Sequence, residues 1–225
     1  MALALGNYTR FCAGTLINSQ FVLTSGVCVH TVQPKKVVLG VHDRNCTTEN
    51  CLSEQMEVNI HRIAYHQLDD NSSPVSDIAL LQLENYVHFT DYIRPICLFP
   101  PPEKREEKLK DFIATGWGNT RSGHLSSVLM TTSLQRLKRR TCESYFNQFV
   151  DSQLCAGSKN HDRDSCSGDS GGPLSAQLNH GGKKRFFQIG IVSLGTSTCN
   201  GIGVYTKVSY FKDWILQTVN GAHSN

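Results

Sequence analysis

The chain has 225 residues, of which 39% are hydrophobic and 18% charged, and its formal net charge is +3. This composition excludes an intrinsically disordered chain, which carries much charge and little apolar material. So small a net charge gives no support for a nucleic-acid or membrane-surface partner, and no apolar run approaches the roughly 20 residues of a membrane-spanning helix.

Short runs rich in Val, Ile and Phe alternate with turn residues along most of the chain, which predicts an all-β fold. No spacing typical of β-α-β units is present, and this argues against a doubly wound parallel sheet. The expected strands are Cys12–Ile17, Phe21–Thr24, Lys36–His42, Met56–Tyr65, Asp77–Leu83, Phe112–Gly116, Phe186–Leu194 and Gly203–Val208.

Two other segments complete the expected organisation. The stretch Pro100–Asp111 has three prolines and mixed charges, so it predicts an exposed linker between two halves. Near the C-terminus, apolar residues recur at helical spacing and predict an amphipathic helix. We therefore expect two β-barrels and a docked terminal helix. The helical face comprises Phe211, Trp214, Ile215, Thr218 and Val219.

Nine cysteines dominate the composition, and no CxxC pair occurs among them, so we expect disulfides rather than a zinc or thioredoxin-type site. Three N-x-[ST] sequons, at Asn7, Asn45 and Asn71, also favour an extracellular location. The odd count predicts one thiol that is free or paired with another chain. The start Met1 to Leu5 is too short and uncharged for a secretory leader, so we expect the chain to begin inside a longer protein.

The segment Asp164–Leu174, DSCSGDSGGPL, is the most informative about chemistry. Three glycines flank Ser170, so little side-chain bulk hinders approach to its hydroxyl. Glycine turns also let successive backbone N–H groups converge, as stabilisation of an oxyanion requires. From spacing alone, a glycine-rich turn with an incidental serine is an equally good interpretation.

GDSGGP resembles the nucleophile motif of the chymotrypsin/trypsin family of serine proteases. DIALLQL, TGWG, IVSLG and GVYTKV resemble further landmarks of that family, and CAGTLIN and FVLTSGVC resemble the strands that lead to its catalytic histidine. These matches span nearly the whole chain in the family's order. The resemblance implies one protease domain over 1–225 without its N-terminal activation segment. It would comprise two six-stranded antiparallel barrels, about 1–100 and about 101–225, the second with the C-terminal helix.

The resemblance also implies roles for individual residues. Ser170 matches the nucleophile and Asp77 the buried acid of the triad, while Gly168 and Ser170 would supply the oxyanion N–H groups. Asp164 matches the base of a pocket that selects Arg or Lys side chains by charge. The pocket walls would be kept open by Gly195 and Gly203, beside Leu194 where the family usually has tryptophan.

The third triad member is missing. The family pattern is L-T-A-A-H-C, whereas this chain has Leu23-Thr24-Ser25-Gly26-Val27-Cys28, so Val27 stands at the position of the general base. A neutral serine needs an adjacent base to accept its proton. In subtilisin, removal of that histidine lowers kcat by about 10⁶. His30 could substitute only if the loop after Cys28 were rebuilt.

By resemblance, the disulfides would be Cys12–Cys28, Cys142–Cys155 and Cys166–Cys199, with Cys46–Cys51 similar to an extra bridge of invertebrate clip-domain proteases. Cys97 would then be unpaired, or tethered to the missing N-terminal segment. The amine freed by activation normally pairs with the aspartate that matches Asp169, and the start of this chain does not resemble that terminus.

The sequence therefore predicts a secreted, non-catalytic homologue of a trypsin-like serine protease, with no cofactor or metal. It would act as a cofactor, decoy or regulator in a proteolytic cascade, with partners that expose Arg or Lys. The main alternative is an active endopeptidase that cleaves after Arg or Lys. A remote one is an α/β-hydrolase whose G-x-S-x-G elbow is followed by Asp213 and His223. The basic run Arg136–Arg140 is predicted to be a solvated loop rather than a polyanion site.

Overall fold

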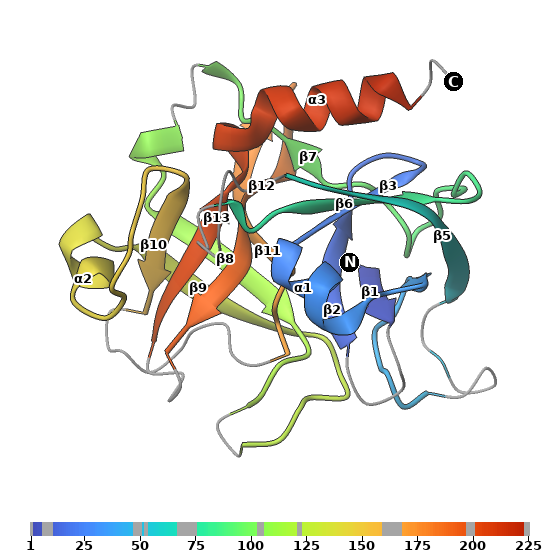
Figure 1. Ribbon diagram of the computed structural model, residues 1–225, viewed down its shortest axis with the longest axis horizontal. Coiled ribbons are helices and arrows are strands. Elements are labelled where there is room, and N and C mark those ends of the chain that lie inside the picture. The colour runs from blue at the N-terminus through green and yellow to red at the C-terminus, as the bar shows by residue number, and fades with distance from the viewer. Residues whose placement is uncertain are drawn as a thin grey trace.

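The computed structural model describes residues 2–5, 11–46, 51, 54–66, 76–102, 106–120, 123–158, 168–196 and 201–222. These residues form two β-units that lie side by side (Figure 1). The first unit is a closed barrel with the strand order β1-β2-β3-β6-β5-β4. Its strands are β1 (Ala2–Leu5), β2 (Phe11–Leu16), β3 (Phe21–Thr24), β4 (Lys36–Leu39), β5 (Met56–Tyr65) and β6 (Ala79–Leu83).

The second unit is a sheet in the order β11-β8-β9-β10-β13-β12-β7. Strands β11 and β12 also pair with each other, so the sheet curls around a core of its own, and β7 adds to β12 in parallel. The predicted all-β fold and its six-stranded first barrel are confirmed, whereas the second unit has seven strands in the described chain instead of the six antiparallel ones expected, because the short β7 adds to β12 in parallel. The strands are β7 (Cys97–Leu98), β8 (Asp111–Gly116), β9 (Met130–Arg136), β10 (Gln153–Gly157), β11 (Pro173–His180), β12 (Lys183–Gly195) and β13 (Ile202–Lys207).

Helices occupy little of the described chain. The short helix α1 (Gly26–Val32) follows β3, and α2 (Arg139–Glu143) follows β9. Two 3-10 turns, η3 (Glu106–Lys108) and η4 (Val208–Phe211), precede β8 and the predicted C-terminal helix, α3 (Lys212–Gly221). That helix is confirmed, and it lies across the end of the molecule in Figure 1. No described helix is long and apolar enough to cross a membrane.

A cluster of apolar side chains joins the two units to the terminal helix. It combines residues of β3 and β6 with Ile191 of β12 and with the buried face of η4 and α3. Burial of these side chains fixes how the two units meet, because interiors pack at crystal-like density. Polar groups at the junction are thereby held at fixed separations. The buried members are Phe21, Leu23, Ile78, Leu80, Ile191, Val208, Phe211 and Ile215.

Two predicted boundaries are wrong for identifiable reasons. The expected strand Lys36–His42 ends at Leu39, because Gly40 has φ +74° and the chain then turns toward Trp117. The expected exposed linker is exposed only in part. Glu106 is buried there, and the guanidinium of Arg136 donates hydrogen bonds to the carbonyls of Glu106 and Leu109.

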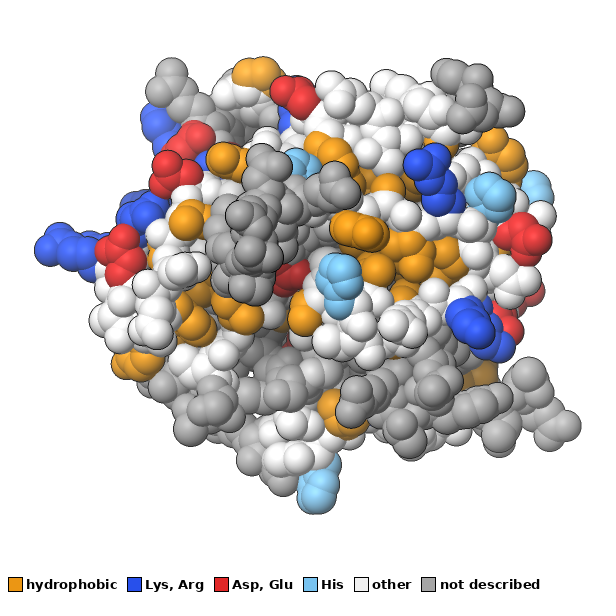
Figure 2. All heavy atoms as spheres, viewed as in Figure 1, with side chains coloured by type: hydrophobic (Ala, Val, Ile, Leu, Met, Phe, Trp, Pro, Cys, Tyr) orange, Lys and Arg blue, Asp and Glu red, His pale blue; other side chains and the backbone are white. Residues whose placement is uncertain are grey.

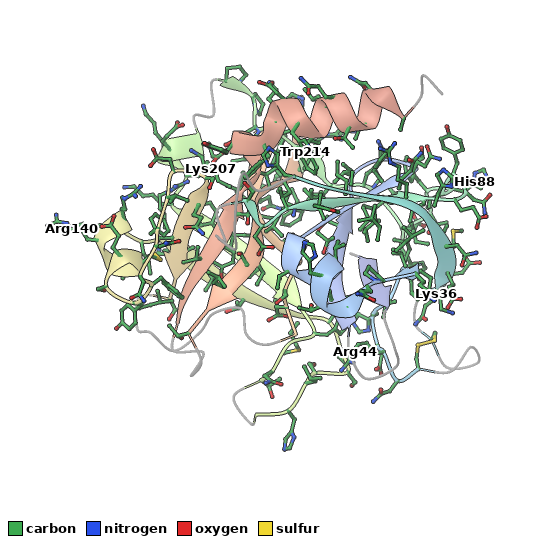
Figure 3. All side chains as sticks on the ribbon, viewed as in Figure 1. Lys36, Arg44, His88, Arg140, Lys207 and Trp214 are labelled. Carbon is green, nitrogen blue, oxygen red and sulfur yellow. A yellow bond between two sulfur atoms is a disulfide. The ribbon has the colours of Figure 1, made fainter. Side chains whose placement is uncertain are left out.

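The basic run divides into residues with different surroundings. Arg136 ends β9 and is held by the segment before β8, whereas Arg139 of α2 pairs with Glu143 and Asp151. Arg140 projects from α2 at the edge of the molecule in Figure 3. On the face seen in Figure 2, basic and acidic side chains are interspersed. The run is therefore neither one continuous loop nor one patch of positive charge.

Candidate functional site

Asp77 lies at the junction of the two units, directly before Ile78 and β6, and only 9% of its surface is exposed. Its carboxylate accepts hydrogen bonds from the N–H groups of Gly26 and Val27 and a short one from the hydroxyl of Ser193 in β12. Its carbonyl accepts another from the hydroxyl of Thr206 in β13, at 2.8 Å. Burial raises the pKa of Asp77, and the hydrogen bonds from Ser193 and the backbone oppose that shift. One carboxylate thus joins elements of both units.

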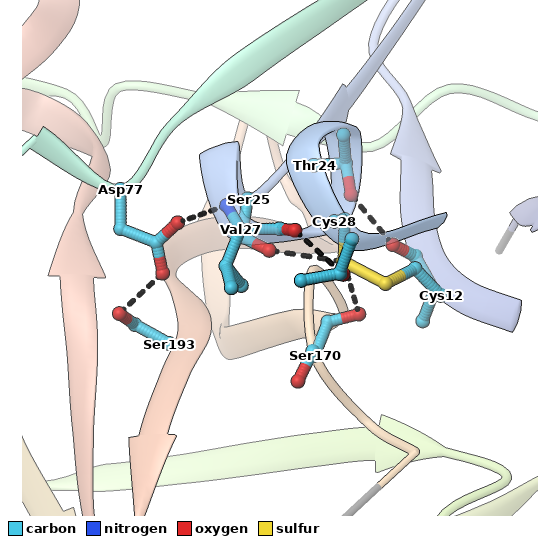
Figure 4. Close-up of a disulfide and its surroundings, with 10 residues drawn as sticks. Cys12, Thr24, Ser25, Val27, Cys28, Asp77, Ser170 and Ser193 are labelled. Carbon is cyan, nitrogen blue, oxygen red and sulfur yellow. Dashed lines mark hydrogen bonds between the residues drawn. A yellow bond between two sulfur atoms is a disulfide. The ribbon is translucent and has the colours of Figure 1, made fainter. Parts of the chain in front are cut away.

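Val27 is the second residue of α1, and its side chain is 40% exposed. Its N–H lies 2.8 Å from Oδ1 of Asp77, and its side chain lies between Asp77 and Ser170 in Figure 4. The backbone that would orient a base at this position is therefore intact. The side chain itself has no nitrogen and can accept no proton.

Ser170 sits in a tight turn that both units hold. Its carbonyl accepts a hydrogen bond from the N–H of Ala13 in β2, at 2.9 Å, and the N–H of Gly171 donates to the carbonyl of Val192 in β12. Gly171 has φ +82°, and a Cβ there would lie 2.2 Å from the carbonyl oxygen of Ala13. Gly168 also has a positive φ, of +102°. Glycine is therefore required on both sides of the half-buried serine.

The side chain of Asp169 rests on the TGWG segment. The N–H of Gly118 donates to its Oδ1 at 2.8 Å. A Cβ on Gly116 or Gly118 would lie only 1.8 or 2.4 Å from a carboxylate oxygen of Asp169. Trp117 between them is fully buried and donates its indole N–H to the carbonyl of His42. The absence of side chains at Gly116 and Gly118 thus leaves the space that this carboxylate occupies.

The pocket residues are described only in part. Asp164 lies outside the described residues. Gly195 and Gly203 are paired partners across β12 and β13, and a Cβ on Gly203 would lie 3.0 Å from the hydroxyl of buried Tyr205. Leu194 is 37% exposed. The residues described at the position of the predicted pocket are therefore small or apolar.

His30 lies one turn beyond Val27 on α1 and is exposed. Its ring packs edge-to-face on Tyr65 at the end of β5, with centroids 5.4 Å apart. Within the described residues it makes no hydrogen bond to Ser170. The structure therefore brings Val27, Asp77 and Ser170 together and leaves His30 on the adjoining surface.

Three disulfides are present among the described residues. They join Cys12 to Cys28, Cys46 to Cys51 and Cys142 to Cys155. The pair Cys166–Cys199 lies outside the described residues. The bridge from Cys12 to Cys28 also touches the turn at Ser170, whose carbonyl oxygen is 3.3 Å from the sulfur of Cys28.

Cys97 of β7 is half-buried and forms no disulfide within the described chain. It lies between two hollows of about 810 and about 570 Å³, and its side chain lines both. No group of three or more acidic, histidine or cysteine side chains among the described residues could hold a metal ion.

Sequence reasoning missed the contributions of Ser193 and Thr206 to the Asp77 site. Both lie within segments that resemble family landmarks, IVSLG and GVYTKV, and this resemblance is the signal that points to them. Asp213 lies in the first turn of α3, and His223 lies outside the described residues. The all-β architecture contradicts the α/β-hydrolase alternative, whose nucleophile lies on a strand-to-helix turn.

A family profile described as Trypsin matches residues 1–215. The chain is 35% identical to serine protease grass of Drosophila melanogaster, over 96% of this chain and 64% of that protein. It is 33% identical to phenoloxidase-activating factor 1 of Holotrichia diomphalia (93% and 62%) and 35% identical to CLIP domain-containing serine protease B15 of Anopheles gambiae (92% and 61%). The chain thus spans less than two thirds of the length of these relatives. The chain belongs to the trypsin family of serine proteases, and its relatives include clip-domain members.

Proposed function

We propose that the protein is a non-catalytic homologue of a trypsin-like serine protease that acts outside the cell as a cofactor, decoy or regulator in a proteolytic cascade. The observation that carries this proposal is Val27, which hydrogen-bonds Asp77 through its main chain and offers no base to Ser170. Without a base the hydroxyl of Ser170 keeps its proton and is a poor nucleophile. Residual catalysis from the oxyanion N–H groups alone falls far short of a working protease.

Two further observations support the extracellular location and the protein partner in this proposal. The three disulfides favour an oxidising compartment. Two similar proteins are named Spaetzle-processing enzyme, of Drosophila melanogaster, and proclotting enzyme, of Tachypleus tridentatus. Those names support a protein partner in a cascade for this chain.

The decisive test is hydrolysis of an arginine ester by four proteins: wild type, Ser170→Ala, Val27→His and His30→Ala. We expect wild type and Ser170→Ala to be equally inactive and Val27→His to gain activity, by up to about 10⁶-fold if the rest of the site is intact. A fluorophosphonate that reacts with activated serines should label only Val27→His. Wild-type hydrolysis clearly above that of Ser170→Ala would contradict the proposal.

The second candidate is an active endopeptidase that cleaves after Arg or Lys with a base other than residue 27. Retention of the Ser170 turn and of the hydrogen-bonded Asp77 carboxylate favours it. The same assay separates the two candidates, because loss of wild-type hydrolysis in His30→Ala would identify His30 as the base.

For the partner, we propose a protein that presents an Arg or Lys side chain to Asp164. Benzamidine, a small arginine mimic, should bind wild type and lose its binding in Asp164→Ala. The matched control is Asp213→Ala, which removes an exposed carboxylate on α3. Equal benzamidine binding by wild type and Asp164→Ala would remove the pocket from the mechanism.

For Cys97 we propose a disulfide to a cysteine outside this sequence, in an N-terminal segment of the full protein. Its half-buried position between two hollows supports this, because a docked segment could cover the sulfur. The intact mass of the natural protein, before and after reduction, tests the tether. A Cys97 thiol that alkylates without reduction would contradict it.

A further inference from the structure

The loop that carries Asn45 is fastened to a second loop, 123–129. The N–H of Arg44 donates to the carbonyl of Ser127 at 2.8 Å. Its guanidinium donates twice to the carbonyl of Ser126, at 3.1 and 2.9 Å. An isolated β-bridge between Asp43 and Val128 adds to this contact. Figure 3 labels Arg44 beside this second loop. The two loops therefore form one surface.

The same second loop reaches the turn that carries Ser170. Leu125 is 45% exposed, and its Cδ2 lies 2.7 Å from where a Cβ on Gly168 would be. Leu125 is thus packed against the glycine two residues before Ser170. Loop 123–129 therefore lies beside the Ser170 turn, and Arg44 ties the Asn45 loop to it.

Asn45 is accessible for modification. It is exposed, and its backbone N–H donates to Oδ1 of Asp43 at 2.9 Å, which fixes the turn. Its side-chain amide makes no hydrogen bond to any described residue. In the sequence it opens the acceptor pattern Asn45-Cys46-Thr47. The other two sequons, at Asn7 and Asn71, lie outside the described residues.

We propose that Asn45 is an N-glycosylation site whose glycan covers Leu125 beside the Ser170 turn. In the transfer, Nδ2 of Asn45 bonds to the anomeric carbon of a sugar, an amide proton is lost, and the diphosphate of a lipid-linked oligosaccharide donor leaves. The glycan is bulky and hydrated, so it hinders a macromolecular partner from approaching over Leu125. The proposal rests on the extracellular location proposed above but not on the absence of catalysis.

Peptide mapping of the protein secreted by insect cells tests the site. We expect the Asn45 peptide to carry a glycan that a peptide-N-glycosidase releases, leaving aspartate. The matching gel shift should disappear in Asn45→Gln and in Thr47→Ala and persist in Asn179→Gln, which alters an exposed asparagine outside any sequon. The same digest reports whether Cys142 and Cys155 are oxidised. If Asn45 is unmodified while this disulfide is formed, the glycosylation site is overturned and the extracellular location stands. If the two cysteines are reduced, the proposed extracellular location is overturned as well.

Hydroxyl-radical footprinting tests whether the glycan covers Leu125. Leu125 should be oxidised several-fold more slowly in the glycosylated protein than in Asn45→Gln. Tyr210, which is 60% exposed on η4, should react equally in both forms. Equal oxidation of Leu125 in a protein whose Asn45 carries a glycan would overturn the shielding while leaving the modification.

Discussion

Asp77 should stabilise the fold even if the protein never catalyses a reaction. Its carboxylate accepts hydrogen bonds from Gly26, Val27 and Ser193, which come from both β-units. In Asp77→Ala, the buried Gly26 N–H and the buried Ser193 hydroxyl lose their acceptor, whereas water can reach exposed Val27. At about 1–3 kcal/mol for each buried unsatisfied donor, the free energy of unfolding should fall by about 4 kcal/mol.

Urea unfolding of the disulfide-bonded protein, followed by the fluorescence of Trp117 and Trp214, measures this loss. Asp77→Asn should cost about 1 kcal/mol, because its amide keeps one acceptor and can donate to Ser193. The loss in free energy of unfolding of the double variant, Asp77→Ala with Ser193→Ala, should be about 1–2 kcal/mol smaller than the sum of the two single losses. The reason is that Ser193→Ala removes the hydroxyl that Asp77→Ala alone leaves unpaired. A loss below about 1 kcal/mol in Asp77→Ala, or simple additivity, would refute the reasoning.

Three further changes test separate parts of the fold. Burial raises the pKa of Glu106 above its usual 4.5. The contribution of Glu106 to the free energy of unfolding is therefore complete below pH 4.5 and is lost as the pH rises through the folded-state pKa. The free energy of unfolding of wild type should therefore fall relative to Glu106→Gln over that pH window, and a constant difference would contradict this. Gly171→Ala should lower the melting temperature sharply, because its Cβ would overlap a carbonyl, while Gly221→Ala, where φ is not positive and a Cβ meets nothing within 4 Å, should have a small effect in the same thermal scan. Replacing Cys142 and Cys155 by alanine removes a bridge of sequence separation 13 and should cost about 3 kcal/mol in urea unfolding; a loss below 1 kcal/mol would argue against that value.

The sequence predicted what local patterns can encode. Helix α3 is predictable because its apolar stripe has a strong helical period, and strand β3 because it begins with the apolar run Phe21–Leu23. Strand β9 was missed because, of its seven residues, only Leu134 is fully buried, so neither a continuous nor an alternating apolar pattern stands out.

For the site, the motifs identified Asp77, Ser170 and Val27, but not the partners of Asp77. Ser193 is 116 residues away from it in the chain, and only the packing of one β-unit on the other brings them together. The contact of Glu106 with Arg136 has a similar origin, since Arg136 lies at the end of β9, 30 residues farther along the chain. Contacts of this range depend on tertiary packing, which composition and periodicity do not report.

The hydrogen bond from residue 27 to Asp77 is made by the main chain. The side chain at position 27, which determines whether a base is present, can therefore change without loss of this stabilising hydrogen bond. Any residue other than proline can occupy position 27 and still complete the hydrogen bonds of the buried carboxylate. A lineage can therefore lose a base here, or regain one, without passing through a poorly folded intermediate. The free energy of unfolding and the chemistry at position 27 can therefore change independently of each other.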